Sequence, residues 1–230
     1  SEESVKHIRL YLKSVGYFQG NAMYSVKTRR KKIKLTYHIT ENIPHYLAAI
    51  TYHTNDSIIE SIITGDTKNS LLKTGDNYDE EKLSSERVRI EKLIKNNGYF
   101  NFSRQYVFFE IDTSDGVKIR VLIKDPPKGQ KHEVFTLDEV NFTTIENPSE
   151  KTGQIRSDTL TYNNIHYKVS KDLFSKKILD NKIKIYPGEK YNLYNTIQTQ
   201  RQLVNLDMFK FININYDTTN NRFVANIFTR

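Results

Sequence analysis

Hydrophobic and polar residues recur along the chain in a pattern that predicts three copies of one unit. Each copy has an amphipathic helix, a stop signal followed by an aromatic residue, and two strands joined by a tight turn. The three helix ends read LKSVGYF (12–18), IKNNGYF (94–100) and LVNLDMF (203–209). The chain is therefore predicted to be built from repeats.

The helices of these copies have apolar stripes that we expect to lie on a sheet. The stripes hold Ile8, Leu12 and Val15 in the first copy, and Leu83, Ile90, Leu93 and Ile94 in the second. Gly16 and Gly98 follow the first two helices, and Asp207 takes the same place in the third. A residue at this position usually has a left-handed backbone, which glycine adopts without strain. The next aromatic residues, Phe18, Phe100 and Phe209, are expected to fold back on the helix that each one leaves.

The segments after each helix alternate with a period of two, which predicts antiparallel strands with one buried face and one exposed face. The apolar positions are Ile33, Leu35, Tyr37 and Ile39 in the first copy, Val117, Ile119, Val121 and Ile123 in the second, and Ile212, Ile214 and Tyr216 in the third. The turns are predicted at Arg30-Lys31, Asp115-Gly116 and Asn220-Asn221.

A strand and a short helix precede the long helix in the second and third copies. They are expected at 46–53 and 57–64, and at 135–144 and near 171–179. A G-x-x-Y core then opens the long helix, with Gly75 and Tyr78 in one copy and Gly188 and Tyr191 in the other. The unit is thus β-α-α-β-β, which makes the fold class α+β.

Pro44, Pro126 and Pro127 mark the joints between the copies. We expect an incomplete first module at 1–43, with only the second helix and the hairpin, a second module at 44–128, and a third at 129–230 with an insertion at 145–169. The uncovered sheet edge of the incomplete module could pair with another chain.

Composition and charge narrow the classes of function. The formal net charge is +8, and there is no cysteine, which excludes thiolate metal sites, a cysteine nucleophile and disulfides within these residues. The densest basic run is Arg29, Arg30, Lys31 and Lys32. Such a run attracts phosphates of nucleic acid or of an anionic membrane, and it is also typical of an exposed turn between two strands. No catalytic or phosphate-binding motif occurs, so we expect no enzyme, metal or cofactor.

With G-Y-F after the helix and K-x-G-x-x-Y before it, the chain resembles POTRA domains of the BamA/TamA outer-membrane β-barrel assembly family. Residues 191–216 resemble the last module before the barrel, with Arg201, Leu203, Leu206, Phe209, Ile212 and Ile214 at the positions of the family pattern. The first copy resembles the N-terminal region of the Bacteroidetes lipoprotein variant of TamA (TamL).

This resemblance implies tandem modules in an elongated array, each with a three-stranded mixed sheet on two helices. It also implies a periplasmic location, as the soluble part of an outer-membrane protein whose own C-terminal β-barrel is not in this chain. The implied partners are unfolded outer-membrane proteins and a TamB-like or other periplasmic assembly protein, but not nucleic acid. The alternative is a basic module that binds nucleic acid or an anionic surface.

The resemblance makes the last strand of a module central and the preceding strand an edge, which can bind an extended peptide through its main chain. The candidate edges are 21–27, 104–111 and 210–216. The second is the predicted client edge and holds Arg104, Gln105, Tyr106, Val107, Phe108, Phe109, Glu110 and Ile111. Either Tyr106 and Phe108 or Val107 and Phe109 should face the core, and the other pair should be exposed. Arg29, Arg30, Lys31 and Lys32 are the predicted partner-docking residues.

Overall fold

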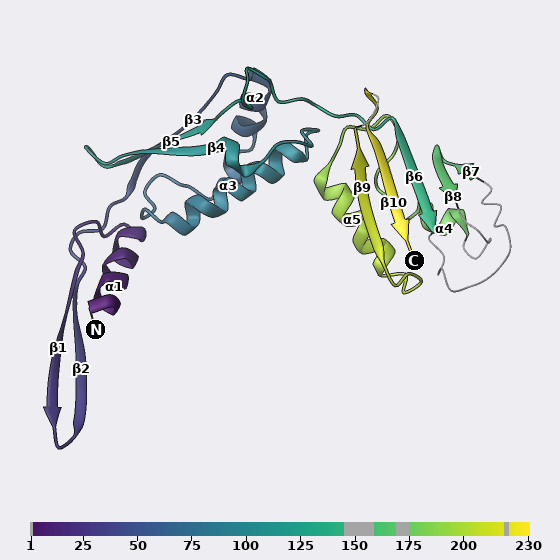
Figure 1. The fold of residues 1–230 in the computed structure, drawn as a ribbon. Helices are drawn as coiled ribbons and strands as arrows, with labels where there is room; N and C mark the ends of the chain where they lie inside the picture. The colour runs from purple at the N-terminus through teal and green to yellow at the C-terminus, as the bar shows by residue number, and fades with distance from the viewer. Residues whose placement is uncertain (1, 145–158, 169–174, 219–220) are drawn as a thin grey trace. The chain divides into compact units, whose positions relative to one another are not determined.

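The computed structural model describes residues 2–144, 159–168, 175–218 and 221–230. The chain divides into two compact units (Figure 1). Unit 1 is Ser1–Glu91 with Ser103–Gln130, and unit 2 is Lys92–Phe102 with Lys131–Arg230. The predicted division into three modules stays a prediction.

Unit 1 begins with a helix and a long hairpin. Helix α1 (Glu2–Ser14) precedes the strands β1 (Asn21–Arg29) and β2 (Lys32–Thr40), which form a two-stranded antiparallel sheet. Val5, Leu12 and Ala22 are buried where α1 lies against β1. Arg30 and Lys31 have φ angles of 47° and 61°. Positive φ at both central residues is typical of a tight hairpin turn, so the predicted turn is confirmed.

The apolar face of this hairpin differs from the prediction. Ile33, Leu35 and Ile39 are 74%, 41% and 51% exposed, so the expectation that these side chains form a buried face was wrong for them. The contacts of α1 are with β1, so Ile39 stays open on β2 although it pairs with Ala22. Ile33 and Leu35 lie closer to the turn, where the hairpin extends past α1 (Figure 1).

The strands and longer helices that follow have the predicted order, and all lie in unit 1 except residues 92–95 at the end of the long helix, which belong to unit 2. The elements are β3 (Leu47–Thr54), α2 (Ser57–Gly65), η1 (Thr67–Asn69), α3 (Glu80–Lys95), η2 (Arg104–Tyr106), β4 (Val107–Asp112) and β5 (Val117–Ile123). The strand order is β3-β5-β4, with β5 parallel to β3 and antiparallel to β4. The last strand is therefore central and β4 is an edge, as expected. Val117, Ile119, Val121 and Ile123 are buried, as are Leu83, Ile90 and Ile94 of α3.

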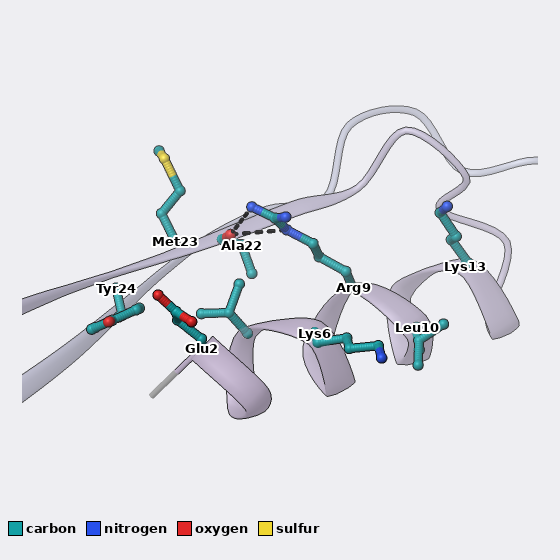
Figure 2. Close-up of a pocket in the computed structure, with 9 residues that line it drawn as sticks. Glu2, Lys6, Arg9, Leu10, Lys13, Ala22, Met23 and Tyr24 are labelled. Atoms are coloured by element: carbon teal, nitrogen blue, oxygen red, sulfur yellow. Dashed lines mark hydrogen bonds between the residues drawn. The ribbon is translucent and has the colours of Figure 1, made fainter.

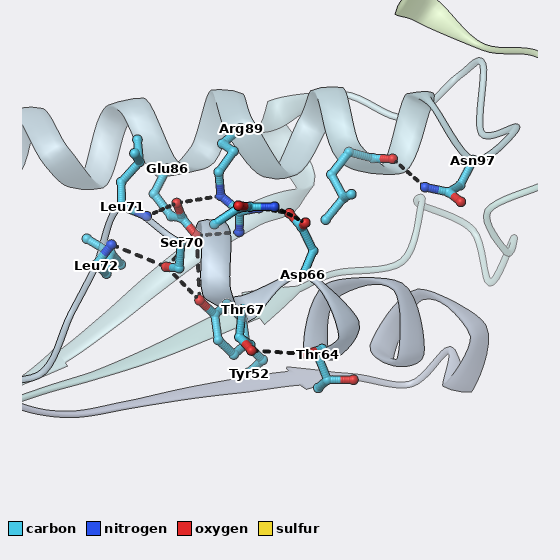
Figure 3. A network of polar contacts seen from close by, with 12 residues as sticks. Tyr52, Thr64, Asp66, Thr67, Ser70, Leu71, Leu72, Glu86, Arg89 and Asn97 are labelled. Atoms are coloured by element: carbon cyan, nitrogen blue, oxygen red, sulfur yellow. Dashed lines mark hydrogen bonds and ion pairs between the residues drawn. The ribbon is translucent and has the colours of Figure 1, made fainter.

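A buried carboxylate joins α3 to the segment before it (Figure 3). Glu86 is fully buried and accepts hydrogen bonds from the Ser70 hydroxyl at 3.0 Å and the Leu71 N–H at 2.9 Å. The Arg89 guanidinium donates to both of its oxygens, at 2.7 and 2.8 Å, and also pairs with Asp66. Because both carboxylate oxygens of Glu86 accept hydrogen bonds, this network fixes α3 against the loop at residues 66–72.

Unit 2 contains a wider sheet than we predicted. Its elements are β6 (Glu139–Thr144), β7 (Thr159–Tyr162), β8 (Ile165–Lys168), α4 (Lys176–Asp180), α5 (Leu193–Val204), β9 (Ile212–Asp217) and β10 (Val224–Thr229). The order is β7-β8-β6-β10-β9. The expected three strands are β6, β10 and β9, with β10 parallel to β6 and antiparallel to β9. The α+β fold class is thus confirmed, and the hairpin β7–β8 extends this sheet by two strands.

The hairpin β7–β8 comes from the predicted insertion at 145–169. Its turn residues Asn163 and Asn164 have φ angles of 48° and 61°, so an Asn-Asn pair was the sequence signal for it. The other residues of the insertion lie outside the described ranges, as do Asn220 and the residues 171–174 of the predicted helix near 171–179. Within the described ranges, α4 at Lys176–Asp180 is the helical part of that prediction.

Two absences concern the described ranges alone. No helix there combines the length and the apolar content needed to span a membrane. The same ranges hold no group of three or more histidine, aspartate or glutamate residues placed to bind a metal ion.

Candidate functional site

A joint of main-chain hydrogen bonds forms where a helix end meets the strand and the G-x-x-Y core that follow it. In unit 2, the Gly98 carbonyl accepts from the Phe135 N–H at 2.9 Å, and the Phe135 carbonyl accepts from the Tyr191 N–H at 2.8 Å. The Leu137 carbonyl then accepts from the Gly188 N–H at 2.7 Å. These bonds hold the helix end, the start of the strand and the G-x-x-Y core in one arrangement.

The same joint occurs in unit 1 with different side chains. The Gly16 carbonyl accepts from the His45 N–H at 2.9 Å, and the His45 carbonyl accepts from the Tyr78 N–H at 2.9 Å. The Leu47 carbonyl accepts from the Gly75 N–H at 2.8 Å. The repeat inferred from the sequence is therefore present as matching hydrogen bonds.

The glycines of both joints have the predicted left-handed backbone. Gly16 and Gly98 have φ angles of 93° and 103°, and Gly75 and Gly188 have φ angles of 91° and 86°. Asp207, in the third copy, has a φ of 54°. The assignment of Gly16, Gly98 and Asp207 to the position after a helix is confirmed.

The aromatic residue after each glycine lies in the joint. The Phe18 ring is 4.8 Å from that of His45 and 5.1 Å from that of Tyr78, measured between centroids. The Phe100 ring is 5.0 Å from that of Tyr191 and 5.8 Å from that of Phe135. The aromatic contacts of both rings are with the segments that follow, because the joint places the next strand and tyrosine beside them. The packing of these rings on the helices that they leave stays a prediction.

In the third copy, Leu203 and Ile212 belong to the core of unit 2, and Leu206, Phe209 and Ile214 pack against that core. The Phe209 ring is 6.0 Å from Phe142 within the core of unit 2. Arg201 is exposed on α5. Its role in the family pattern therefore stays a prediction.

The predicted client edge is a strand only in part. Val107–Asp112 form β4, an edge strand, whereas Arg104, Gln105 and Tyr106 form the short helix η2. The expectation that the strand begins at Arg104 was wrong. The Tyr106 carbonyl accepts from the Lys124 N–H at 2.9 Å, so it faces the central strand. Successive residues of a strand point their N–H and C=O groups to opposite sides. The main-chain groups of Val107, Phe109 and Ile111 therefore point away from β5, to the open side of the sheet.

The two faces of β4 differ in burial. Val107 is buried, and the Phe109 ring is half-buried with the Arg87 guanidinium 5.2 Å from its centre. Phe108 is 40% exposed on the other face, and the Lys124 ammonium lies 3.9 Å from the centre of its ring. Of the two pairs left open by the sequence, Val107 and Phe109 are the core pair.

The other two candidate edges are also outer strands among the described residues. Residues 21–27 lie in β1, which pairs with β2 on one side, and residues 212–216 lie in β9, at the end of the five-stranded sheet. Lys210 and Phe211 precede β9, and both N–H groups donate to the Arg230 carbonyl. All three candidate edges thus contain a strand with one open side.

A groove of about 580 Å³ follows the open side of β1 (Figure 2). Arg9 crosses it from α1 and donates from Nε and Nη2 to the Ala22 carbonyl, at 3.1 and 2.7 Å. Arg9 is not among the site residues predicted from the sequence. Arg9 stands seven residues before Gly16, as Gln200 stands seven residues before Asp207. This matching place in two copies is the sequence feature that could have identified Arg9. The groove is lined by Glu2, Val5, Lys6, Arg9, Leu10, Lys13, Ala22, Met23 and Tyr24.

The predicted docking residues lie together at the turn of the hairpin. Arg29, Arg30, Lys31 and Lys32 are all exposed. A second hollow of about 530 Å³ lies beside them, lined by Lys27, Arg29, Arg30, Lys32, Ile33 and Lys34. The turn thus gathers positive charge around the exposed Ile33.

No protein-family model matches the sequence, and no curated protein matches it significantly. Solved structures do match. A BamA structure from Haemophilus ducreyi that lacks POTRA domains 1–3 has a TM-score of 0.54 and 10% identity, over 81% of this chain and 29% of that chain. POTRA domains 3–5 of Haemophilus influenzae BamA give a TM-score of 0.49 and 14% identity, over 100% of this chain and 79% of that one. The N-terminal domain of Omp85 from Thermosynechococcus elongatus gives a TM-score of 0.33 and 13% identity, over 100% of this chain and 84% of that one. The match to the Haemophilus ducreyi structure shows a likeness of fold to POTRA domains.

Proposed function

We propose that the chain is the periplasmic POTRA region of an outer-membrane protein assembly or translocation factor, and that it binds extended client strands by β-augmentation. The observation that carries the proposal is the edge strand β4, whose Val107, Phe109 and Ile111 main-chain groups face an open side. Binding of this kind uses the main chain of the ligand, so many client sequences can bind one edge weakly.

We further propose that the chain belongs to the TamA branch of the family and binds a TamB-like periplasmic partner. The sequence resemblance to TamL favours the TamA branch of the family and a TamB-like periplasmic partner. We place the docking of that partner at Arg29, Arg30, Lys31 and Lys32, because exposed cations at the end of a hairpin provide a strong positive field. The modules act as a binding surface and not as an enzyme.

The edge proposal is tested by an amide-resolved NMR titration of this chain. The ligand is an extended peptide copied from a transmembrane strand of an outer-membrane barrel, and a scrambled polar peptide is the control. We expect chemical-shift changes at Val107–Asp112. The absence of changes at millimolar peptide, in all three edge strands, would contradict client binding.

A proline variant separates edge pairing from side-chain contact. The Ile111 N–H points to the open side of β4, so Ile111→Pro removes an outward donor and leaves the pairing with β5 in place. Peptide binding at β4 should be lost in this variant and kept in Ile111→Val. Binding that survives the proline would show that the peptide does not pair with β4.

The docking proposal needs its own experiment. Replacement of Arg29, Arg30, Lys31 and Lys32 by glutamate should abolish binding of a TamB-like partner while β4 still binds peptide. Unchanged partner binding would reject this site. The alternative function, binding of nucleic acid or an anionic surface, is favoured by the same exposed cations, and a gel shift with random DNA at increasing salt distinguishes it.

A further inference from the structure

We propose that the groove between α1 and β1 selects extended peptides with acidic side chains, and that Arg9 determines this selectivity. The inference rests on the proposed β-augmentation and adds to it the chemical class of the ligand at one edge. It concerns β1, where Arg9 bridges the groove, and not the predicted client edge β4 (Figure 2).

The main chain of β1 offers pairing groups to this groove. The Ala22 carbonyl accepts from Arg9, and the Ala22 N–H donates to the Asn21 side-chain oxygen at 2.9 Å. Both groups of Ala22 therefore point away from β2. Because the direction alternates along a strand, the groups of Tyr24, Val26 and Thr28 also point to the open side.

The helix wall of the groove is positively charged. Lys6, Arg9 and Lys13 are exposed, line the groove, and lie on one side of α1 at helical spacing. Lys6 and Lys13 are about 10 Å apart along the helix axis, at 1.5 Å of rise per residue. Alternate side chains of a strand are about 7 Å apart, so two carboxylates on the same face of a bound strand fit within this row. Glu2 lines the groove near its other end, where it disfavours a further acidic residue.

The groove also has apolar walls for the remaining side chains of such a peptide. Leu10 and Met23 are 55% and 59% exposed and both line it, together with Tyr24. An occupant that alternates acidic and apolar residues therefore matches the groove in charge and in polarity. A strand with only neutral polar side chains would leave the three cations without partners of opposite charge.

Arg9 makes the selection because its present acceptor is a neutral carbonyl. A hydrogen bond between two charged groups is roughly twice as strong as one between neutral groups, and guanidinium binds carboxylate through two parallel bonds. An acidic strand thus draws Arg9 away from Ala22 and frees that carbonyl for pairing. A neutral strand leaves Arg9 on the carbonyl, where it occupies the first outward acceptor of the edge.

The corresponding positions in the other copies differ in chemistry. Gln200 of α5 donates from Nε2 to the Ile212 carbonyl, the first residue of β9, at 3.3 Å. Glu91 of α3 stands seven residues before Gly98, and an ionised carboxylate cannot donate to a carbonyl. The position seven residues before the residue that follows the helix is therefore cationic only in the first copy, and acid selection through this position is specific to β1.

The test uses two extended peptides that differ only in having glutamate or glutamine at alternate positions between apolar residues. Amide shifts of Tyr24, Val26 and Thr28 report binding at β1. In the wild-type chain at low salt, we expect the glutamate peptide to bind roughly tenfold more tightly, since charged hydrogen bonds are the stronger ones. In Arg9→Gln, which keeps a donor for the Ala22 carbonyl as Gln200 does for Ile212, the preference should fall to about twofold because only lysines remain.

Lys73→Gln is the matched control, because it removes one exposed cation from unit 1 at a residue that lines neither the groove nor the hollow beside the hairpin turn. This variant should keep the full preference for the glutamate peptide over the glutamine peptide. Equal binding of the two peptides by the wild-type chain would overturn acid selection while leaving β-augmentation intact. A preference that survives in Arg9→Gln would overturn the role of Arg9. If neither peptide shifts any amide of β1, β4 or β9, the proposed function itself fails.

Discussion

The carbonyl oxygen of Gly98 accepts a hydrogen bond from the main-chain N–H of Phe135 at 2.9 Å, in the same way that Gly16 accepts from His45. Both glycines have positive φ angles, which turn the carbonyl at the helix end toward the strand that follows. The left-handed turn after the helix is thus part of the joint as well as the end of the helix.

Gly98→Ala should destabilise unit 2 by about 1 to 2 kcal/mol, because a left-handed backbone is unfavourable for residues with a Cβ. The new Cβ would also lie 2.7 Å from Val134 Cγ1, which must shift. Urea unfolding measures the change. Gly188→Ala is the control, since its φ is 86° and no atom lies within 4 Å of the added Cβ. A larger loss at Gly188 than at Gly98 would contradict the packing argument.

Phe100→Ala should reduce the free energy of unfolding of unit 2 by about 3 kcal/mol, the usual result of removing a packed aromatic ring. The ring lies among Phe135, Tyr191, Tyr216 and Phe223, with centroid distances from 5.0 to 5.8 Å. Phe108→Ala removes a ring from an exposed face and should lose less than about 1 kcal/mol. Similar losses for the two variants in a denaturant titration would reject the central place of Phe100.

Glu86→Gln should lower the stability of unit 1 by about 2 to 3 kcal/mol at neutral pH, because it leaves the half-buried Arg89 with a neutral and therefore weaker partner. Glu110→Gln breaks an exposed ion pair with Arg120 and should change the stability by less than about 1 kcal/mol. Thermal unfolding of both variants gives the comparison. Equal effects would mean that the buried network is no more important than a surface pair.

The same carboxylate should make unit 1 sensitive to acid. Burial acts to raise the pKa of Glu86, but hydrogen bonds from Arg89, Leu71 and Ser70 outweigh burial and hold its pKa below the usual value of 4.5. The stability from this group is therefore present above the unfolded pKa and is lost as the pH falls through the lower folded pKa. The difference between wild type and Glu86→Gln should shrink on acidification, as unfolding from neutral to acidic pH would measure. A constant difference would contradict the lowered pKa.

The tyrosines of the two G-x-x-Y cores should lose their hydroxyl protons only at a pH above the usual range for tyrosine. Burial raises the pKa of Tyr191 to about 12, and burial with the nearby Glu80 carboxylate raises the pKa of Tyr78 to about 12. Because the neutral forms are favoured in the folded state, their contribution to stability is present below pH 10 or so, the unfolded pKa, and is lost toward pH 12. Ultraviolet absorbance of tyrosinate in Tyr78→Phe and Tyr191→Phe measures this. If the tyrosine removed by either substitution proves to titrate near its unfolded pKa, the burial argument is rejected.

Features fixed by a few neighbouring residues could be predicted from the sequence. Gly16, Gly98 and Asp207 follow apolar helical stripes, and their positive φ angles agree with that place. The turn at Arg30-Lys31 lies between two alternating segments, and its position needed no knowledge of the rest of the chain. Local spacing determines each of these conformations.

Features that depend on distant partners could not be predicted in this way. Glu86 belongs to an ordinary charged helix in the sequence, and its burial follows from Ser70 and Leu71, which meet it only in the fold. The exposure of Ile33 depends on how far α1 covers the hairpin. The place of Arg9 in the groove depends on the Ala22 carbonyl, which lies 13 residues further along the chain and accepts its hydrogen bonds.

His45 and Phe135 share neither charge nor shape, yet each supplies the same N–H and C=O groups to its joint. Nineteen of the twenty amino acids have both groups, and proline alone lacks the donor. Substitutions at these two positions can therefore accumulate over evolutionary time without removing the hydrogen bonds. Ancestry of such joints is best traced by comparing backbone geometry, because that geometry persists after sequence identity has faded.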